Sequence, residues 1–334
     1  MYDEIAKTIA ENKVVPEVLL YDADFACYEC ADIDLPMSQI VKRVLAKAET
    51  LRKMSGASKV RLYLTLGEKS GRDLIATVKP YQENRGEANE RRLLAREVRT
   101  ALVNIKVTST KLEVVPCYFF EADDVMSRDH VAFNNDNQYR SCICSGDKDL
   151  KINHGLHMNS EGEITKVPTT FGYTGYKEVG NVKPKLVGYG TSYFWHQMIM
   201  GDTADNIPGL PELAPATADY FMPLKSWKPR KKNIKCGEAK AVIMLQNVKS
   251  DKLAASVVYD AYIHLYGAEA TARFMEQAYL LWMQQTPDVY DVEVFLQFNC
   301  GLSKAKFTDK QRTILDNWVT KIQAEKEHEV YYPN

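Results

Sequence analysis

The sequence predicts an α/β protein in which helices flank a mostly parallel central sheet. Apolar segments rich in β-branched residues recur at 17–22, 59–66, 112–118 and 139–144, and each ends near an acidic residue. Segments with helical spacing lie between them, and strands that alternate with helices are typical of a parallel sheet covered on both faces. Ligands of such sheets bind beyond the carboxyl ends of the strands, which is where the acidic residues fall.

Two helices are predicted between the first three strands. The first begins just after Pro36, because apolar residues then recur at spacings of three and four. Its apolar face consists of Met37, Ile40, Val41, Val44, Leu45, Ala48 and Leu51. A more charged helix follows, with Leu93, Leu94, Val98 and Leu102 on one face.

The second half of the chain is predicted to be mainly helical. Residues 153–192 are rich in Gly, Asn, Lys and Tyr and predict loops with short strands. A helical pattern begins at Ser192 and ends at Gly201, whereas the prolines of 206–240 exclude a single regular element there. Further helices are predicted at 238–247, 251–266, 268–284 and 308–325.

The composition is that of a globular protein in a reducing compartment. Charged residues make up 26% of the 334 residues and the formal net charge is −1, so a nucleic-acid surface would require segregated charge. The N-terminus lacks the apolar core of a signal peptide, and no apolar run reaches a membrane-spanning length. Seven cysteines, an odd number, favour free thiols. We therefore expect a cytoplasmic protein with no membrane partner.

Carboxylates follow five separate apolar segments of the chain. The candidate ligands are Asp22, Glu68, Glu121, Asp123, Asp124, Asp147, Asp149, Asp202 and Asp205. Carboxylates gathered at strand ends repel one another unless cations sit between them, and hard oxygen ligands suit Mg²⁺ or Mn²⁺. The pattern predicts a site for two Mg²⁺ (or Mn²⁺) ions that cleaves phosphodiester bonds.

Each acidic group has an ordinary explanation when it is taken alone. The run 121–124 fits the first turn of a helix, where the helix dipole favours negative charge. Asp147 and Asp149 fit a loop end and a helix cap, and Asp202 and Asp205 fit turn positions before a proline. Five such stretches in one chain favour a shared site over five separate explanations.

Two basic stretches could supply a positive field for nucleic acid. Acidic residues interleave with the first, which runs from Lys69 to Arg99, so a solvated helix face is the plainer interpretation there. The second has no acid among its residues and therefore favours phosphate contact. It comprises Lys225, Lys228, Arg230, Lys231, Lys232 and Lys235, and its Trp227 could stack on a base.

The chain resembles the 5′-nuclease superfamily of flap endonucleases and polymerase I 5′-exonuclease domains. Free-standing phage 5′→3′ exonucleases are the most similar members, and the resemblance covers about residues 17–245. Its motifs occur in family order and are specific in combination. They are Tyr21-Asp22, Lys79-Pro-Tyr-Gln-Glu-Asn-Arg85, Glu121-Ala-Asp-Asp124, Ser145-Gly-Asp-Lys-Asp149 and Gly201-Asp-Thr-Ala-Asp-Asn-Ile-Pro-Gly209.

The resemblance implies roles for individual residues. The nine carboxylates named above would bind the metal pair, although Glu68 stands where the family usually has aspartate. Residues 70–105 would form a helical arch, with Asp22, Lys79 and Arg85 in catalytic roles. Gln82 stands where family members usually have a catalytic lysine, so either Lys79 serves instead or the chemistry of the arch differs.

Other residues are implied to bind DNA. The segment that begins at Ile207 resembles a helix-hairpin-helix element in which backbone amides hold a phosphate, and 237–241 could be its second half. The implied DNA-binding residues are Arg72, Lys79, Arg85, Gly209, Lys228, Arg230, Lys231, Lys232, Lys235 and Lys240.

The resemblance implies an Mg²⁺-dependent 5′→3′ exonuclease and flap endonuclease. Its partner would be duplex DNA with a 5′ end, nick or flap, or an RNA primer on DNA, in phage-type replication or host-DNA breakdown. Residues 1–200 would form a PIN-like catalytic core and residues 201–334 a helical duplex-binding region. The protein would act in the host cytoplasm if a phage encodes it.

Two alternative functions remain open at this point. Asp22-Ala-Asp24 after a strand also resembles the nucleophile motif of haloacid-dehalogenase-type phosphatases, with Gly201-Asp202 as their late acidic motif. That interpretation leaves the acidic run 121–124 unexplained. The other alternative is a DNA-structure-binding protein without activity, against which the complete acidic set argues.

Overall fold

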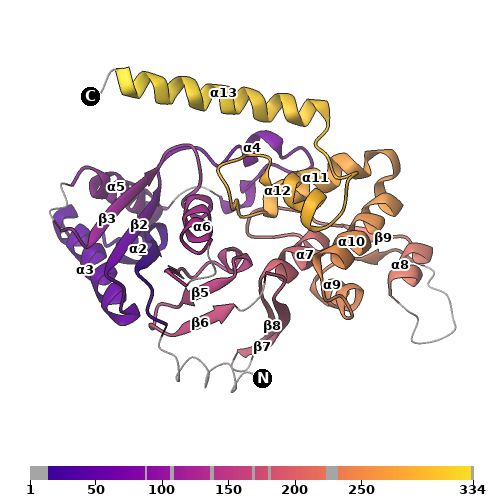
Figure 1. Cartoon of the computed structure of the whole chain (residues 1–334), viewed down its shortest axis with the longest axis horizontal. Coiled ribbons are helices and arrows are strands. Elements are labelled where there is room, and N and C mark those ends of the chain that lie inside the picture. Colours follow the sequence, from indigo (N-terminus) through magenta and orange to yellow (C-terminus); the bar gives the residue numbers. More distant parts are fainter. Residues whose placement is uncertain are drawn as a thin grey trace. The chain divides into compact units, whose positions relative to one another are not determined.

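The computed structural model describes residues 14–86, 89–105, 109–135, 139–167, 170–179, 182–222 and 232–331. The chain folds into two compact units, which are interleaved along the sequence (Figure 1). Unit 1 comprises Met1–Ser70, Gly86–Gly172 and Met283–Thr286, and unit 2 comprises Gly71–Arg85, Tyr173–Trp282 and Pro287–Asn334. The division expected at residue 200, between a catalytic core and a duplex-binding region, concerns function rather than compactness and stays a prediction.

Unit 1 contains a six-stranded sheet, and its strand order is β3-β2-β1-β4-β5-β6. The first five strands along the chain pair in parallel, and only β6 is antiparallel to its neighbour. The mostly parallel sheet predicted from the sequence is therefore confirmed. The strands are β1 (Val18–Asp22), β2 (Lys59–Thr65), β3 (Leu112–Cys117), β4 (Ser141–Cys144), β5 (Gly155–Met158) and β6 (Ile164–Val167).

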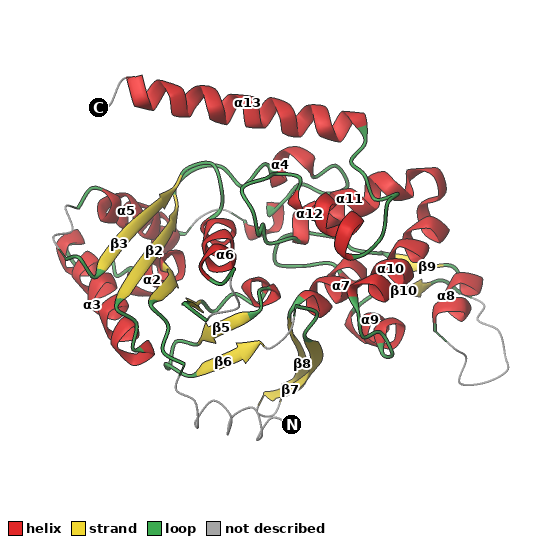
Figure 2. Ribbon diagram, in the orientation of Figure 1, coloured by secondary structure: helices red, strands yellow, loops and turns green. Residues whose placement is uncertain are grey.

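Helices cover both faces of this sheet (Figure 2). Side chains alternate along β1, so Leu19 and Tyr21 join one buried cluster while Val18 and Leu20 join another. The first cluster packs the sheet against α2 (Ala23–Cys30), α3 (Met37–Ser55) and α5 (Glu90–Val103). The second cluster packs it against α6 (Ala122–Phe133) and the 3₁₀ helix η2 (Asp149–Ile152). A strand buried on both faces is apolar along its buried length, which explains the residues from Val18 to Tyr21 of β1.

The helix α3 begins directly after Pro36, as predicted. It ends before Gly56, whose φ of 76° is the left-handed conformation that commonly terminates helices. Its residues Ile40, Val44 and Leu51 are fully or almost fully buried, which confirms the apolar face read from the spacing.

Unit 2 is mainly helical, with one long antiparallel hairpin. The hairpin pairs β7 (Tyr173–Val179) with β8 (Val182–Tyr189), in a region where loops with short strands were expected. A second, shorter pair joins β9 (Glu212–Leu213) to β10 (Ile234–Lys235). The helical elements are α4 (Arg72–Ile75), η1 (Glu83–Arg85), α7 (Thr191–Met200), α8 (Pro215–Phe221), α9 (Glu238–Leu245), α10 (Asp251–Tyr266), η3 (Gly267–Glu269), α11 (Ala270–Leu281), α12 (Asp291–Val294), η4 (a π-helix, Phe295–Asn299) and α13 (Asp309–Tyr331).

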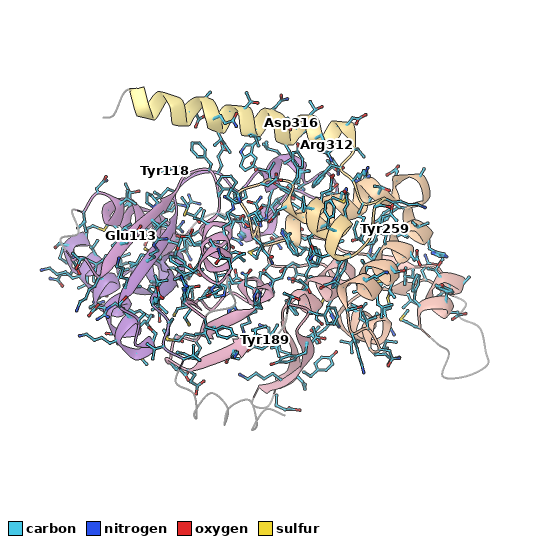
Figure 3. All side chains as sticks on the ribbon, viewed as in Figure 1. Glu113, Tyr118, Tyr189, Tyr259, Arg312 and Asp316 are labelled. Atoms are coloured by element: carbon cyan, nitrogen blue, oxygen red, sulfur yellow. The ribbon has the colours of Figure 1, made fainter. Side chains whose placement is uncertain are left out.

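Aromatic side chains form the core of unit 2. Phe194 and Trp195 of α7 contact each other edge to face, and Trp282 stacks on Phe295 with ring centroids 4.4 Å apart. The helix α13 is fastened to the preceding segment through Tyr290. The Tyr290 hydroxyl donates to Asp316 over 2.6 Å and Arg312 lies over its ring, and Figure 3 labels both α13 residues. Among the described residues, no helix is long and apolar enough to cross a membrane.

Candidate active site

The carboxyl ends of the first four strands carry most of the predicted ligands of unit 1. Because β1, β2, β3 and β4 are parallel, these ends lie at the same edge of the sheet. Asp22 is the last residue of β1, and Glu68 lies in the loop after β2. Glu121 precedes α6 after β3, and the segment 147–149 follows β4. Tertiary structure thus brings four separate acidic segments to one edge.

Asp22 is held by the start of the following helix, α2, and by the segment after β4. Its carboxylate caps α2 by accepting a hydrogen bond from the Phe25 amide over 3.4 Å. The Ser145 hydroxyl donates to Oδ2 of Asp22 over 2.8 Å and accepts a hydrogen bond from the Asp147 amide over 2.9 Å. Ser145 therefore joins Asp22 to the acidic segment 147–149, a role that the sequence alone did not reveal.

The charges at this edge repel one another. Burial, reinforced by the negative charge of Asp24, raises the pKa of Asp22 to about 6. Burial also raises the pKa of Asp24, although the Arg99 guanidinium 3.3 Å away opposes the shift. Glu121 adds to the negative field at Asp24. An edge at which carboxylates resist ionisation is one where a bound cation would be stabilised.

Asp24 differs from Asp22 because its carboxylate pairs with a cationic side chain of the protein. It accepts a hydrogen bond from the Thr65 amide over 3.0 Å and pairs with Arg99. The side chain thereby ties the start of α2 to the end of β2 and to α5. Arg99 belongs to the basic stretch that the sequence placed on a solvated face, and its partly buried position corrects that interpretation for this residue.

Glu121, Asp123 and Asp124 form a tight acidic cluster in unit 1. One carboxylate oxygen from each lies within 4.8 Å of the others. Glu121 is the N-cap of α6 and the two aspartates occupy its first turn, so the helix dipole also favours their charge. All three offer carboxylate oxygens, the ligand type that Mg²⁺ and Mn²⁺ prefer. The donor set present therefore fits such a cation.

Asp124 is more deeply buried than Glu121 and Asp123. It is fully buried, Oδ2 accepts a hydrogen bond from the Ser70 hydroxyl, and Oδ1 accepts one from the Gln284 amide over 3.0 Å. The Glu121 amide donates to the same Ser70 hydroxyl over 2.9 Å. Ser70 therefore positions both ends of the cluster, a second relationship that the sequence did not indicate.

The acidic segment after β4 is stabilised internally. The Asp149 amide donates to Oδ1 of Asp147 over 2.9 Å, and the Lys148 ammonium lies 3.0 Å from the Asp149 carboxylate. The alternative expectation, a loop end followed by a helix cap, is partly met because η2 begins at Asp149. These local bonds fix the backbone of the segment beside Asp22.

Asp202 and Asp205 belong to unit 2, where they form a tightly bonded loop. Asp202 and Ile207 exchange backbone hydrogen bonds of 2.8 and 2.7 Å. Oδ1 of Asp202 accepts the Ala204 amide over 2.8 Å, and the residue is almost fully buried. The turn expectation for this acidic group is therefore also met. Gly201 has to be glycine, because its φ is 72° and an added Cβ would lie 2.3 Å from the Ile207 carbonyl.

This acidic loop is bonded to the segment that carries Arg85. The Arg85 guanidinium pairs with the Asp205 carboxylate, and the Gln82 amide donates to the Asp205 carbonyl over 2.9 Å. Asn84 donates to the Thr203 carbonyl, and Asn206 donates to the Pro80 carbonyl over 2.9 Å. Both asparagines belong to the sequence motifs quoted above, and that membership was the available signal for their roles.

Two predicted DNA-binding residues are corrected by the structure. Arg72 is 1% exposed, and its guanidinium donates to the Trp282 carbonyl over 2.8 Å, so it anchors α4 instead of contacting phosphate. The Gly209 amide donates to Oε1 of Gln277 over 2.9 Å in a buried position and is therefore committed within the protein. A basic stretch indicated Arg72 and a sequence motif indicated Gly209, but neither indicated the partners that bind them.

The remaining predicted DNA-binding residues differ in exposure. Lys79, Arg85, Lys232 and Lys235 are exposed, whereas Lys240 on α9 is half-buried. Lys225, Trp227, Lys228, Arg230 and Lys231 lie outside the described residues. The second half of the predicted arch, α5, packs Ala95, Val98 and Leu102 into the core of unit 1. The arch itself stays a prediction.

The fold has solved counterparts. A crystal structure of the bacteriophage T5 D15 protein with metal ions matches the chain with a TM-score of 0.52 and 13% identity, covering 91% of this chain and 98% of that one. A structure of T5 5′-exonuclease with divalent zinc ions matches at 0.49, with 13% identity and coverage of 91% and 98%. A complex of the T5 D15 flap endonuclease with DNA and metal ions matches at 0.43, with 14% identity and coverage of 79% and 98%.

The comparisons by sequence found no match, whereas the comparison of structures did. No protein-family model matches the chain. No curated protein matches it by sequence. At 13% identity, the likeness to the T5 D15 protein establishes a shared fold.

Proposed function

We propose that this chain, which has the fold of the phage T5 D15 protein, is a metal-dependent nuclease acting at the 5′ ends of DNA. The observation that carries the proposal is the edge of the unit 1 sheet, where carboxylates from four strand ends gather. The structure that supplies the fold match was crystallised with metal ions, which supports a metal-dependent activity. The order of motifs along the sequence supports the same class of enzyme.

The carboxylates of unit 1 would hold the divalent cations. The strongest candidates lie at the carboxyl edge of the sheet: Asp22 at the end of β1, Glu121 and Asp123 at the start of α6, and Asp147 after β4. Glu68 is a further candidate from its place after β2, and Asp202 and Asp205 are candidates from their sequence motif. Mg²⁺ or Mn²⁺ in a two-metal site lowers the pKa of a bound water and stabilises the departing oxygen.

Other residues would orient the ligands and the substrate. Ser145 and Ser70 hold the carboxylates that they contact, and such supporting hydrogen bonds fix ligand direction. Lys79 and Arg85 are exposed and cationic and are proposed to contact the DNA phosphate near the cleaved bond. Lys232 and Lys235, with the basic residues just before them, are proposed to bind the duplex backbone.

The finer substrate class follows from the resemblance. We propose cleavage 5′→3′ from duplex ends and nicks, removal of 5′ flaps, and removal of RNA primers on DNA. The setting would be phage-type replication or host-DNA breakdown in the cytoplasm of a host cell. Residues 70–105 would guide the 5′ strand as a helical arch.

Cleavage assays with matched substrates test the proposal. Duplex, nicked, flap and RNA-primed substrates labelled at the 5′ end should give short 5′ products in Mg²⁺ and none in a chelator. Asp147→Ala should abolish cleavage while DNA affinity in Ca²⁺ stays within about threefold, because the carboxylate serves the metal rather than the phosphate backbone. Full activity of this variant in Mg²⁺ would refute the site.

Assays on the same purified protein distinguish the two alternative functions. Tight flap binding without Mg²⁺-dependent cleavage would indicate a binding protein that lacks activity. Hydrolysis of a small phosphomonoester through a covalent aspartyl phosphate on Asp22, with intact DNA, would indicate the phosphatase.

A further inference from the structure

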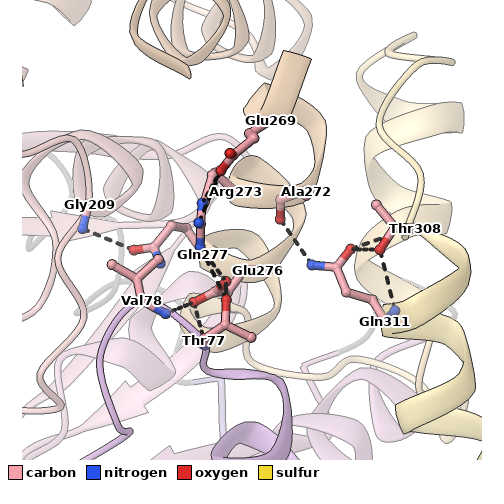
Figure 4. A network of polar contacts seen from close by, with 10 residues as sticks. All are labelled: Thr77, Val78, Gly209, Glu269, Ala272, Arg273, Glu276, Gln277, Thr308 and Gln311. Carbon is pink, nitrogen blue, oxygen red and sulfur yellow. Dashed lines mark hydrogen bonds and ion pairs between the residues drawn. The ribbon is translucent and has the colours of Figure 1, made fainter. Parts of the chain in front are cut away.

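The helix α11 contacts two segments of unit 2 that carry predicted functional motifs (Figure 4). Its neighbouring residues Glu276 and Gln277 are each 2% exposed, yet both are polar. Neither belongs to the motifs singled out from the sequence. Buried polar side chains in native proteins are matched to specific partners, so the partners indicate what this pair does.

Glu276 forms hydrogen bonds with the segment that leads to Lys79 and Arg85. Oε1 accepts hydrogen bonds from the Thr77 amide over 2.8 Å and from the Val78 amide over 2.9 Å. Oε2 accepts a hydrogen bond from the Thr77 hydroxyl. A carboxylate that accepts two adjacent amides fixes the direction of the backbone at that point. Lys79 is the next residue of the chain.

Arg273, one turn earlier on α11, completes this contact. Its Nη1 lies 3.7 Å from the Glu276 carboxylate and donates to the Thr77 hydroxyl over 3.2 Å. On its outer side Arg273 pairs with Glu269 over 3.1 Å, and Glu269 is 68% exposed. The buried Glu276 thus holds the segment 77–78, whereas the exposed Glu269 pairs with Arg273 at the protein surface.

Gln277 holds the other motif-bearing loop. Its Oε1 accepts the Gly209 amide over 2.9 Å. Gly209 has a φ of 60°, and an added Cβ would lie 2.3 Å from the Gly201 amide nitrogen. The two glycines that bracket the acidic loop therefore pack backbone to backbone, and Gln277 fastens this junction to α11.

The helix α11 is itself firmly anchored. Nε2 of Gln311 donates to the Ala272 carbonyl over 3.0 Å, while its Oε1 accepts the Thr308 amide at the start of α13 (Figure 4). At the other end, Arg72 donates to the Trp282 carbonyl over 2.8 Å. The segment 71–85 is therefore fastened to α11 and its C-terminal neighbour at two points, Arg72 and Thr77.

We propose that Glu276 and Gln277 are positioning residues, which hold the Lys79–Arg85 segment and the 201–209 loop in mutual register. The consequence is the pairing of Arg85 with Asp205, together with the backbone bond from Gln82 to Asp205. Neither residue touches the substrate in this role. The proposal rests on the proposed nuclease function only for its kinetic consequence, because the positioning itself is a property of the fold.

Glu276→Gln is the principal test. The substitution keeps the volume and one acceptor but replaces the other with an amide that cannot accept the Thr77 hydroxyl proton. We expect kcat on a 5′-flap substrate to fall at least tenfold, with the Kd for DNA in Ca²⁺ changed less than threefold. Glu269→Gln, which removes the exposed partner of the same arginine, should keep kcat within twofold of the unaltered protein.

A double-mutant cycle distinguishes positioning from general destabilisation. If Glu276 acts through Lys79 and Arg85, adding Glu276→Gln to the double variant Lys79→Ala/Arg85→Ala should change kcat less than twofold further. Losses that multiply in the triple variant would overturn the proposal. Thr77→Val, which removes only the hydroxyl, should reproduce a smaller part of the Glu276→Gln loss and provides a second variant if the first fails to fold.

Hydrogen exchange tests the positioning without any activity. In Glu276→Gln the amides of 77–82 should exchange at least tenfold faster, whereas those of α10 should keep their protection. In Gln277→Ala the faster exchange should appear at 203–209. Unchanged exchange in both segments would overturn the proposal. Absence of cleavage by the unaltered protein would instead refute the nuclease function and leave the exchange result to decide the positioning.

Discussion

The Ser145 hydroxyl donates a 2.8 Å hydrogen bond to the Asp22 carboxylate and thereby links the ends of β1 and β4. These strands are neighbours in the sheet, but their ends are far apart in sequence. The same hydroxyl accepts the Asp147 amide, so one small side chain sets the spacing of two acidic segments. The hydroxyl is uncharged, and its removal takes no carboxylate out of the site.

Ser145→Ala should weaken metal binding more than it weakens the fold. The hydroxyl makes two hydrogen bonds, and the loss of each costs about 1 kcal/mol of unfolding free energy. Loss of a residue that orients a metal ligand typically costs about 10–100-fold in metal affinity. Titration calorimetry with Mn²⁺ and urea unfolding measure the two effects on one preparation. Ser58→Ala, which removes a hydroxyl bonded to the Glu17 carbonyl, is the control and should leave Mn²⁺ affinity unchanged.

Asp124 and Asp123 are neighbours with opposite expected behaviour. Asp124→Asn should destabilise unit 1 by about 1–3 kcal/mol, because the buried carboxylate accepts bonds from Ser70 and Gln284 that an amide cannot fully replace. Asp123→Asn should cost less stability, because Asp123 is only half-buried, and should reduce Mn²⁺ affinity, because it removes a negative charge from the cluster. Thermal unfolding without metal, compared with Mn²⁺ titration, separates the two. Equal destabilisation by both substitutions would contradict the distinct roles.

The histidine pair of unit 1 should make the fold sensitive to acid. The rings of His130 on α6 and His157 on β5 lie 5.8 Å apart, and burial lowers their pKa values to about 3 and about 4. Below pH 6.5 the unfolded chain therefore binds protons that the folded chain excludes. This contribution to stability is present above pH 6.5 and is lost as the pH falls toward 4.

The variant His130→Gln should show a weaker loss of unfolding free energy between pH 6.5 and pH 4. The difference from the unaltered protein should approach about 1.4 kcal/mol per pH unit for the one proton concerned. Urea unfolding across this range measures it, and the difference between the two proteins removes the contribution of all other groups. His264→Gln, at an exposed position on α10, is the control for the removal of a histidine outside the pair.

Gly67 is required by the close approach of two loops at the carboxyl edge. An added Cβ would lie 2.1 Å from the Tyr118 carbonyl oxygen, which also accepts the Glu68 amide over 2.7 Å. Gly67→Ala should therefore cost about 1–3 kcal/mol of unfolding free energy by overpacking. Gly146→Ala is the matched control, because a Cβ there would meet nothing within 4 Å. Comparable losses in both variants would show that the approach at Gly67 is not the cause.

The local pattern of apolar residues in the sequence was sufficient to predict the layered α/β architecture. Alternation along β1 and the three-and-four spacing after Pro36 depend on which face of an element is buried, and that information is written into adjacent residues. The position of the acids follows as well, because parallel strands end at one edge and each acid comes just after its strand. Asp22 and Glu121 could therefore be assigned to a common edge from the chain alone.

Hydrogen-bond partners were decided by the tertiary structure. Arg72 belongs to a basic stretch and Gly209 to a recognisable motif, yet their groups bind Trp282 and Gln277, which no local pattern connects to them. Ser145 with Asp22, and Glu276 with Thr77, are likewise distant in sequence. Such pairings depend on the direction and distance between two side chains in space. The periodicity of buried residues in the sequence carries no information on either, so only the tertiary structure revealed these pairings.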